Sequence, residues 1–101
     1  MSFDPTEKLS EKGVKDLVKE ILDHGGSFTL SRHARERMVE RTYNYRDIRH
    51  IIEYGRMANT EFNTKANNWK YTFKGEDLDG DSGKVVMAII TANNCIVITV
   101  I

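Results

Sequence analysis

The sequence has little cysteine, little proline and no long hydrophobic run, and each shortage excludes a class of protein. The single cysteine, Cys95, cannot form an internal disulfide, which argues against a disulfide-stabilised secreted scaffold. The longest uninterrupted apolar run, residues 85–90, is far shorter than the roughly 18 residues that a membrane span requires. No basic stretch followed by an apolar one opens the chain, so we expect no signal peptide, no membrane partner and a cytoplasmic location.

The length and composition of the chain are typical of one folded domain. The chain has 101 residues, of which 40% are hydrophobic and 30% are charged. That balance argues against a largely disordered chain, and the length matches the commonest domain size. We therefore expect a single domain over residues 1–101.

The formal net charge is zero, but the charges are unevenly distributed. Every arginine lies between Arg32 and Arg56, and every lysine lies outside that window. Residues 28–60 carry seven arginines against four acids, whereas residues 1–27 and 61–101 lean acidic. Because a guanidinium fork fits phosphate with two hydrogen bonds, this sorting indicates a site in the middle segment. Ordinary solvation of helix surfaces is the alternative, and the overall neutrality argues against a broad duplex-DNA surface.

Three helices are predicted from apolar spacing and capping residues. Asp4 followed by Pro5 is one helix-start signal, Ser10 is a later one, and Gly25 with Gly26 ends that helix. A second helix is predicted over residues 32–41. A third has Asn44 as N-cap, Asp47 three residues later, and its end at Gly55. The residues expected on the buried sides of these helices are Val14, Leu17, Val18, Ile21, Leu22, Ala34, Met38, Val39, Tyr45, Ile48, Ile51 and Ile52.

The strands follow a period of two. Residues 27–30 form a short strand candidate after the first helix, and residues 56–62, 69–74, 84–91 and 95–101 are candidates after the third. The element order predicts an α+β domain: N-terminal helix, short strand, two helices, then a three- to four-stranded antiparallel sheet with helices packed on one face.

The chemistry-bearing stretch is the second helix. His33, Arg37 and Arg41 are separated by steps of four, so they share one helix face. An imidazole can move a proton near neutral pH, and two guanidiniums can hold a phosphate and stabilise developing negative charge. These parts suit metal-independent cleavage of RNA by its own 2′-hydroxyl. The alternative is that both arginines form surface ion pairs with Glu36, Glu40 or Glu53 and that His33 only caps the junction between strand and helix.

The run His33-Ala34-x-x-Arg37-Met38-x-x-Arg41 resembles the signature of a bacterial family of small domains of unknown function, often encoded beside MqsA-type antitoxins. Its pattern is similar to that of the RelE-like toxins, small α+β ribonucleases. The resemblance covers roughly residues 13–101 and includes Asp47-Ile48, Gly55, Trp69-x-Tyr71-x-Phe73, Gly75 and Ile98-Thr99-Val100. It implies a RelE- and barnase-like fold, a metal-independent endoribonuclease toxin without cofactor, and a protein antitoxin as partner.

Two departures from the family pattern bear on activity. Family members commonly follow the second arginine with Gly-Ile-Ser, whereas Thr42-Tyr43-Asn44 stand here. Members often end in Ile-Thr-Val-Tyr, whereas Ile101 replaces the aromatic residue here. These departures favour an alternative hypothesis, in which the chain is a degenerate toxin fold that binds a partner without enzymatic activity.

Other residues are weaker candidates. Arg32, Arg49 and Lys70 are expected to help hold RNA. His50 either extends that surface or lies on a solvated helix face, and His24 suits the end of the first helix. Cys95 has no partner at metal-ligand spacing. The acidic stretch 77–81 lacks the glycine and glutamate of a calcium-binding loop, so we expect an exposed turn and no metal.

Overall fold

The computed structural model describes residues 4–101, so residues 1–3 of the predicted domain lie outside the described part. The described chain is an α+β structure in which three helices pack against a five-stranded sheet. The elements in chain order are α1 (Glu11–Asp23), β1 (Ser27–Leu30), α2 (Arg32–Arg41), α3 (Tyr45–Tyr54), β2 (Arg56–Asn63), β3 (Asn68–Glu76), β4 (Ser82–Thr91) and β5 (Asn94–Val100).

The sheet has the order β1-β5-β4-β3-β2. Strands β2 to β5 form the predicted antiparallel sheet. The prediction is corrected at β1, which pairs in parallel with β5 and makes the sheet mixed. Parallel neighbours need a crossover connection, and here α2, α3 and three strands separate the partners. The local pattern of a four-residue strand carries no signal for so distant a partner.

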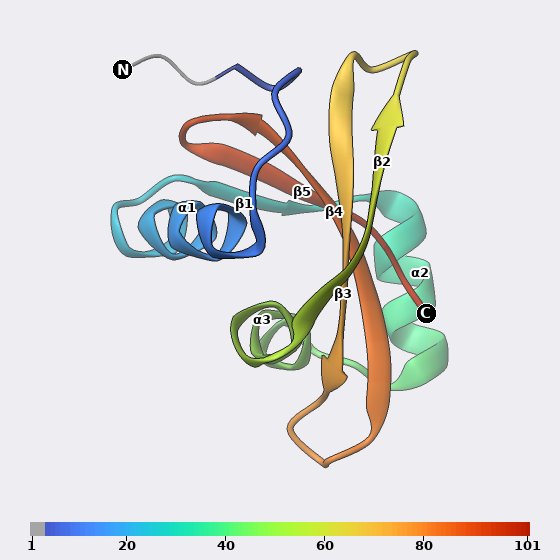
Figure 1. Cartoon of the computed structure of the whole chain (residues 1–101). Helices are drawn as coiled ribbons and strands as arrows, with labels where there is room; N and C mark the ends of the chain where they lie inside the picture. The colour runs from blue at the N-terminus through green and yellow to red at the C-terminus, as the bar shows by residue number, and fades with distance from the viewer. Residues whose placement is uncertain (1–3) are drawn as a thin grey trace.

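Side chains of β3 alternate between two faces of the sheet. Tyr71 and Phe73 are buried in the core, whereas Lys70 and Thr72 on the opposite face are only half-buried and Lys74 is exposed. The core joins these aromatic rings to the buried sides of the helices. Figure 1 shows α1 and α3 together on one side of the strands, while α2 lies beside the end of β5.

The first helix begins later than its first start signal. Ser10 is the N-cap, and its side chain accepts a hydrogen bond from the Gly13 amide at 3.0 Å. The predicted start at Asp4 is wrong, because Asp4 closes a turn by accepting from the Thr6 amide and hydroxyl. The segment between the two signals instead contacts β3, where the Trp69 indole N–H donates to the Thr6 carbonyl at 2.8 Å. These contacts with β3 hold the segment out of helical geometry.

The second and third helices match their predicted bounds. Ser31 caps α2, and the Asn44–Asp47 capping box starts α3, which ends at Gly55. Two residues predicted as buried are not. Val39 is 80% exposed because it lies about 100° around α2 from buried Met38. Tyr45 is 37% exposed and lies in the first turn of α3, where its ring makes an edge-to-face contact with Phe28.

Helix α2 ends at Thr42, which has a positive φ of 56°. This left-handed conformation costs an L-residue about 1–2 kcal/mol, whereas glycine adopts it freely. We expect Thr42→Gly to raise the free energy of unfolding by about 0.5–1 kcal/mol, measured by urea denaturation. Thr42→Ala is the matched control, since it removes the same hydroxyl but keeps the strained Cβ. Equal stability of the two variants would contradict this account.

Candidate functional site

The N-terminus of α2 is anchored to β5. The Ser31 side chain accepts a hydrogen bond from the Ala34 amide at 3.0 Å and donates one to the Ile98 carbonyl at 2.6 Å. The Ser31 amide also donates to the Val97 carbonyl. Buried Ala34 and Met38 fix the inward side of the helix. The helix is therefore held in one rotation about its axis, which decides where its polar residues lie.

The two predicted catalytic arginines reach the end of the sheet. The Arg37 Nε donates to the Val100 carbonyl at 3.3 Å, and its terminal nitrogen lies 3.1 Å from a Glu40 carboxylate oxygen. Arg41 donates to the Ser82 carbonyl at 3.2 Å. Two of the three residues on the predicted helix face, Arg37 and Arg41, thus contact the last residue of β5 and the first of β4.

The ion pair between Arg37 and Glu40, one of those that the sequence allows for this arginine, is present. Both side chains are partly exposed, and such pairs contribute only about 0–1 kcal/mol. The ion pair is therefore a weak constraint on the Arg37 guanidinium, which the Val100 carbonyl also contacts. For Arg41 the structure shows no pairing with a carboxylate among the described residues.

His33 lies in the first turn of α2 and is exposed. Within residues 4–101 its imidazole has no hydrogen-bond or ion-pair partner, so both ring nitrogens are open to a ligand. It is one turn from Arg37 and two turns from Arg41 along the same helix face. The first turn of a helix also carries backbone N–H groups that favour an anion.

Sequence reasoning missed the part that Tyr43 plays beside these residues. The Tyr43 hydroxyl accepts a hydrogen bond from Arg41 at 3.3 Å, and the guanidinium lies 5.0 Å from the ring centre. Tyr43 packs so closely on Gly83 that a Cβ there would lie 2.0 Å from the hydroxyl oxygen. Only the tertiary contact between Tyr43 and β4 reveals this, because Tyr43 read locally is one residue of a turn.

Thr99 completes the polar groups near Arg37. Its hydroxyl lies 3.4 Å from the Val100 carbonyl oxygen, which also accepts from Arg37. The lone hydroxyl of the terminal strand therefore lies close to the guanidinium. His33, Arg37, Arg41, Tyr43 and Thr99 together form what we call the α2 site. It offers one proton-transfer group, two cations and two hydroxyls.

The three predicted RNA-holding residues are scattered. Arg32 is at the start of α2, is almost fully exposed and lies 3.3 Å from Glu36. Lys70 lies on β3 with its ammonium 3.6 Å from a Glu61 carboxylate oxygen. Arg49 lines a small groove of about 130 Å³ between α1 and α3, where no residue of α2 takes part. Of the three, only Arg32 lies on the same helix as the α2 site.

The remaining candidates have structural explanations. His24 is the C-cap residue of α1, and its backbone N–H donates to the Glu20 carbonyl. Burial raises the pKa of the Cys95 thiol to about 12, which keeps it protonated and unreactive at neutral pH. The acidic stretch is not wholly exposed as predicted, because Asp77 is buried and accepts hydrogen bonds from the Asp79 and Asp81 amides.

Comparison with known proteins gives one match. The sequence pattern of a family described as a domain of unknown function, DUF4258, matches residues 30–101. This match covers β1's last residue, α2, α3 and strands β2 to β5, and leaves α1 outside. No curated protein and no solved structure matches the chain.

Proposed function

The chain belongs to the DUF4258 family, and because that description names no activity, we propose a function from the residues of the α2 site. The domain binds single-stranded RNA and cleaves it, acting as a toxin that a protein antitoxin neutralises. The observation that carries this proposal is that an imidazole without a polar partner in residues 4–101 shares a helix face with two guanidiniums that contact the sheet end. The resemblance of the helix to the RelE-like pattern also supports it.

The proposed reaction uses three side chains of the α2 site, the 2′-hydroxyl of the RNA and a proton from solvent. His33 takes the proton of the RNA 2′-hydroxyl, and the resulting oxygen attacks the adjacent phosphorus. The bond from phosphorus to the 5′-oxygen breaks, and that oxygen takes up a proton from solvent. Arg37 and Arg41 balance the negative charge that builds on the phosphate oxygens in the transition state. The products are a 2′,3′-cyclic phosphate and a 5′-hydroxyl.

The competing proposal is a binding protein without enzymatic activity. The observation in its favour is that Arg37 already contacts Glu40 and the Val100 carbonyl. In this reading the α2 site contacts a protein partner, and His33 has no chemical role.

Incubation of the purified chain with single-stranded RNA in excess EDTA tests the proposal. We expect cleavage products that end in a 2′,3′-cyclic phosphate, and no cleavage of a strand whose ribose at the cut position is 2′-deoxy. Cleavage of the deoxy strand at the same rate would contradict the mechanism. An uncut RNA together with a stable complex between the chain and the product of a neighbouring gene would instead support the binding protein.

A further inference from the structure

A second cavity lies apart from the α2 site, where the end of α3 meets β2 and β3. It has a volume of about 480 Å³, within the range of small-molecule sites in proteins. Its polar lining is His50, Tyr54, Arg56, Lys74, Glu76 and Ser82. Two basic residues, two residues with ring side chains and one acidic residue therefore line one open hollow with the volume of a small-molecule site. We call this space the α3 cavity.

The cations of the α3 cavity belong to a row across three strands. Arg56 on β2 is the register partner of Lys74 on β3, and Lys74 is the partner of Lys84 on β4. Directly paired residues project from the same face, with Cβ atoms about 4.5–5.5 Å apart, and like charges so placed repel. No ion pair within residues 4–101 includes any of the three. The fold thus holds three cations in a row that an anion would stabilise.

The rings of the α3 cavity are placed for stacking and hydrogen bonding. Tyr54 is 70% exposed, and its ring centre lies 4.8 Å from that of His50. The Nδ1 atom of His50 lies 2.8 Å from the Glu76 carbonyl oxygen. Because a carbonyl only accepts, we assign the proton to Nδ1, which leaves Nε2 free for a ligand. An exposed aromatic ring beside cations is the pattern that binds a base and its phosphate.

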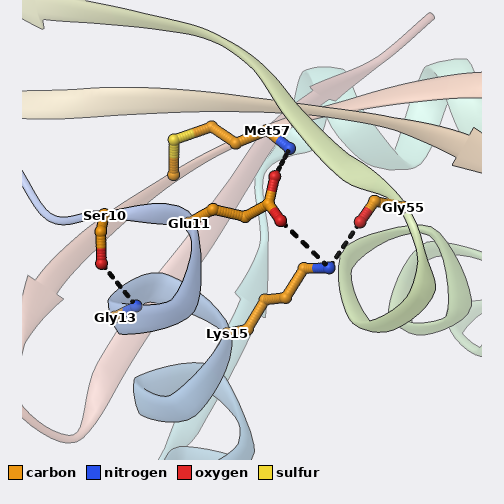
Figure 2. Close-up of polar contacts among 6 residues, drawn as sticks. All are labelled: Ser10, Glu11, Gly13, Lys15, Gly55 and Met57. Atoms are coloured by element: carbon orange, nitrogen blue, oxygen red, sulfur yellow. Dashed lines mark hydrogen bonds and ion pairs between the residues drawn. The ribbon is translucent and has the colours of Figure 1, made fainter.

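Helix α1 contacts the backbone of Gly55 and Met57, the two chain neighbours of Arg56, and Figure 2 shows these contacts. The Lys15 ammonium donates to the Gly55 carbonyl, and the Met57 amide donates to a Glu11 carboxylate oxygen at 2.7 Å. Lys15 and Glu11 also form an ion pair with each other at 3.9 Å. These contacts hold the α3–β2 junction, so Arg56 begins from a fixed backbone position at the rim of the cavity.

We propose that the α3 cavity binds a phosphorylated nucleoside, with the base on Tyr54 and His50 and the phosphate on Arg56 and Lys74. The ligand is either a free nucleotide or one nucleotide of an RNA strand, since the recognised chemistry is the same. The proposal goes beyond RNA cleavage at the α2 site, because the cavity binds a nucleotide whether or not α2 cuts RNA. The exposed carboxylate of Glu76 offsets only one of the two cations.

Titration of the full chain with adenosine 5′-monophosphate, followed by NMR and calorimetry, tests this proposal. We expect shifts of the His50 and Tyr54 ring signals, and dissociation constants raised about 10-fold by Arg56→Gln or Lys74→Gln. Adenosine, which has no phosphate, is expected to bind at least about 10-fold more weakly than the monophosphate. Lys65→Gln is the matched control, because this exposed lysine lies in the β2–β3 turn and its loss changes the net charge equally.

The outcomes separate the possibilities. No shift of His50 and Tyr54 at millimolar nucleotide, or equal affinity of wild type, Arg56→Gln and Lys74→Gln, would overturn the proposal. A single-stranded hexanucleotide of 2′-deoxyriboses, which the α2 site cannot cut, identifies a nucleic-acid strand as the ligand if it binds more than about 10-fold tighter than the monophosphate and Arg56→Gln weakens its binding equally, whereas affinity equal to the monophosphate identifies a free nucleotide. Both cations are exposed and mutually repulsive, so either variant is expected to stay folded, which thermal unfolding checks.

Discussion

Replacing His33 with alanine is expected to lower the rate of RNA cleavage by about 10²- to 10⁴-fold, the usual loss when a general acid or base is removed. The imidazole is exposed and has no polar partner in the described chain, so its removal leaves no buried group unsatisfied. Stability should therefore stay within about 0.5 kcal/mol of wild type, the range for surface substitutions. Cleavage rates with excess RNA and urea unfolding curves measure the two quantities separately.

The matched control is His24→Ala. His24 is an exposed histidine at the end of α1, and within the described part of the chain its hydrogen bonding is confined to its backbone. Cleavage by this variant should equal that of wild type. In growing bacteria, induction of wild type or His24→Ala should arrest growth, whereas His33→Ala should not. Equal toxicity of wild type and His33→Ala would rule out a catalytic imidazole at the α2 site.

Local signals predict α2 and α3 well because their ends are set by neighbouring residues. Ser31 and Asn44 supply side-chain caps, and Gly55 ends α3 next to the first residue of β2. The start of α1 is predicted less well, since Asp4 carries an equally good local signal but the segment is bound to β3 instead. The start of α1 therefore depends on contacts between segments far apart in sequence. The identities of neighbouring residues give no information about such contacts.

The candidate functional residues also differ in whether local sequence or long-range contacts bring them together. Steps of four place His33, Arg37 and Arg41 on one face of any helix, so the sequence alone predicts that they share a face. The α3 cavity could not be predicted in this way. Arg56, Lys74 and Lys84 come together only through the pairing of β2 with β3 and of β3 with β4. Strand register depends on hairpin geometry and packing, so the distribution of charges along the sequence does not predict which residues pair across strands.

The arginine-rich middle segment therefore does not form one surface. Arg37 and Arg41 lie against the sheet end, Arg49 lies in the groove between α1 and α3, and Arg56 joins two lysines on the sheet. The net charge of zero is a sum over the whole chain and does not show these separate groups of positive charge. Such an arrangement favours small sites with local positive charge over one broad basic surface.

The largest change in stability is expected from Gly55→Ala. A Cβ at this position would lie 2.3 Å from the Ile51 carbonyl oxygen and 2.6 Å from the Lys74 carbonyl oxygen. Both atoms belong to backbone in regular elements, so neither can move aside as a flexible side chain would. The end of α3 would have to separate from β3, and we expect the free energy of unfolding to fall by more than about 2 kcal/mol.

Gly25→Ala is the matched control for Gly55→Ala. It tests the cost of a Cβ in the left-handed backbone conformation without a steric clash with neighbouring atoms. Gly25 has a φ of +75°, and a Cβ there would meet no atom within 4 Å. Its substitution should therefore cost only the left-handed conformation, about 1 kcal/mol. Urea unfolding of both variants measures the difference, and a loss of stability at Gly55 no greater than that at Gly25 would contradict the tight packing.

Since Gly55 directly precedes Arg56, Gly55→Ala should also weaken nucleotide binding at the α3 cavity, whereas Gly25→Ala should not.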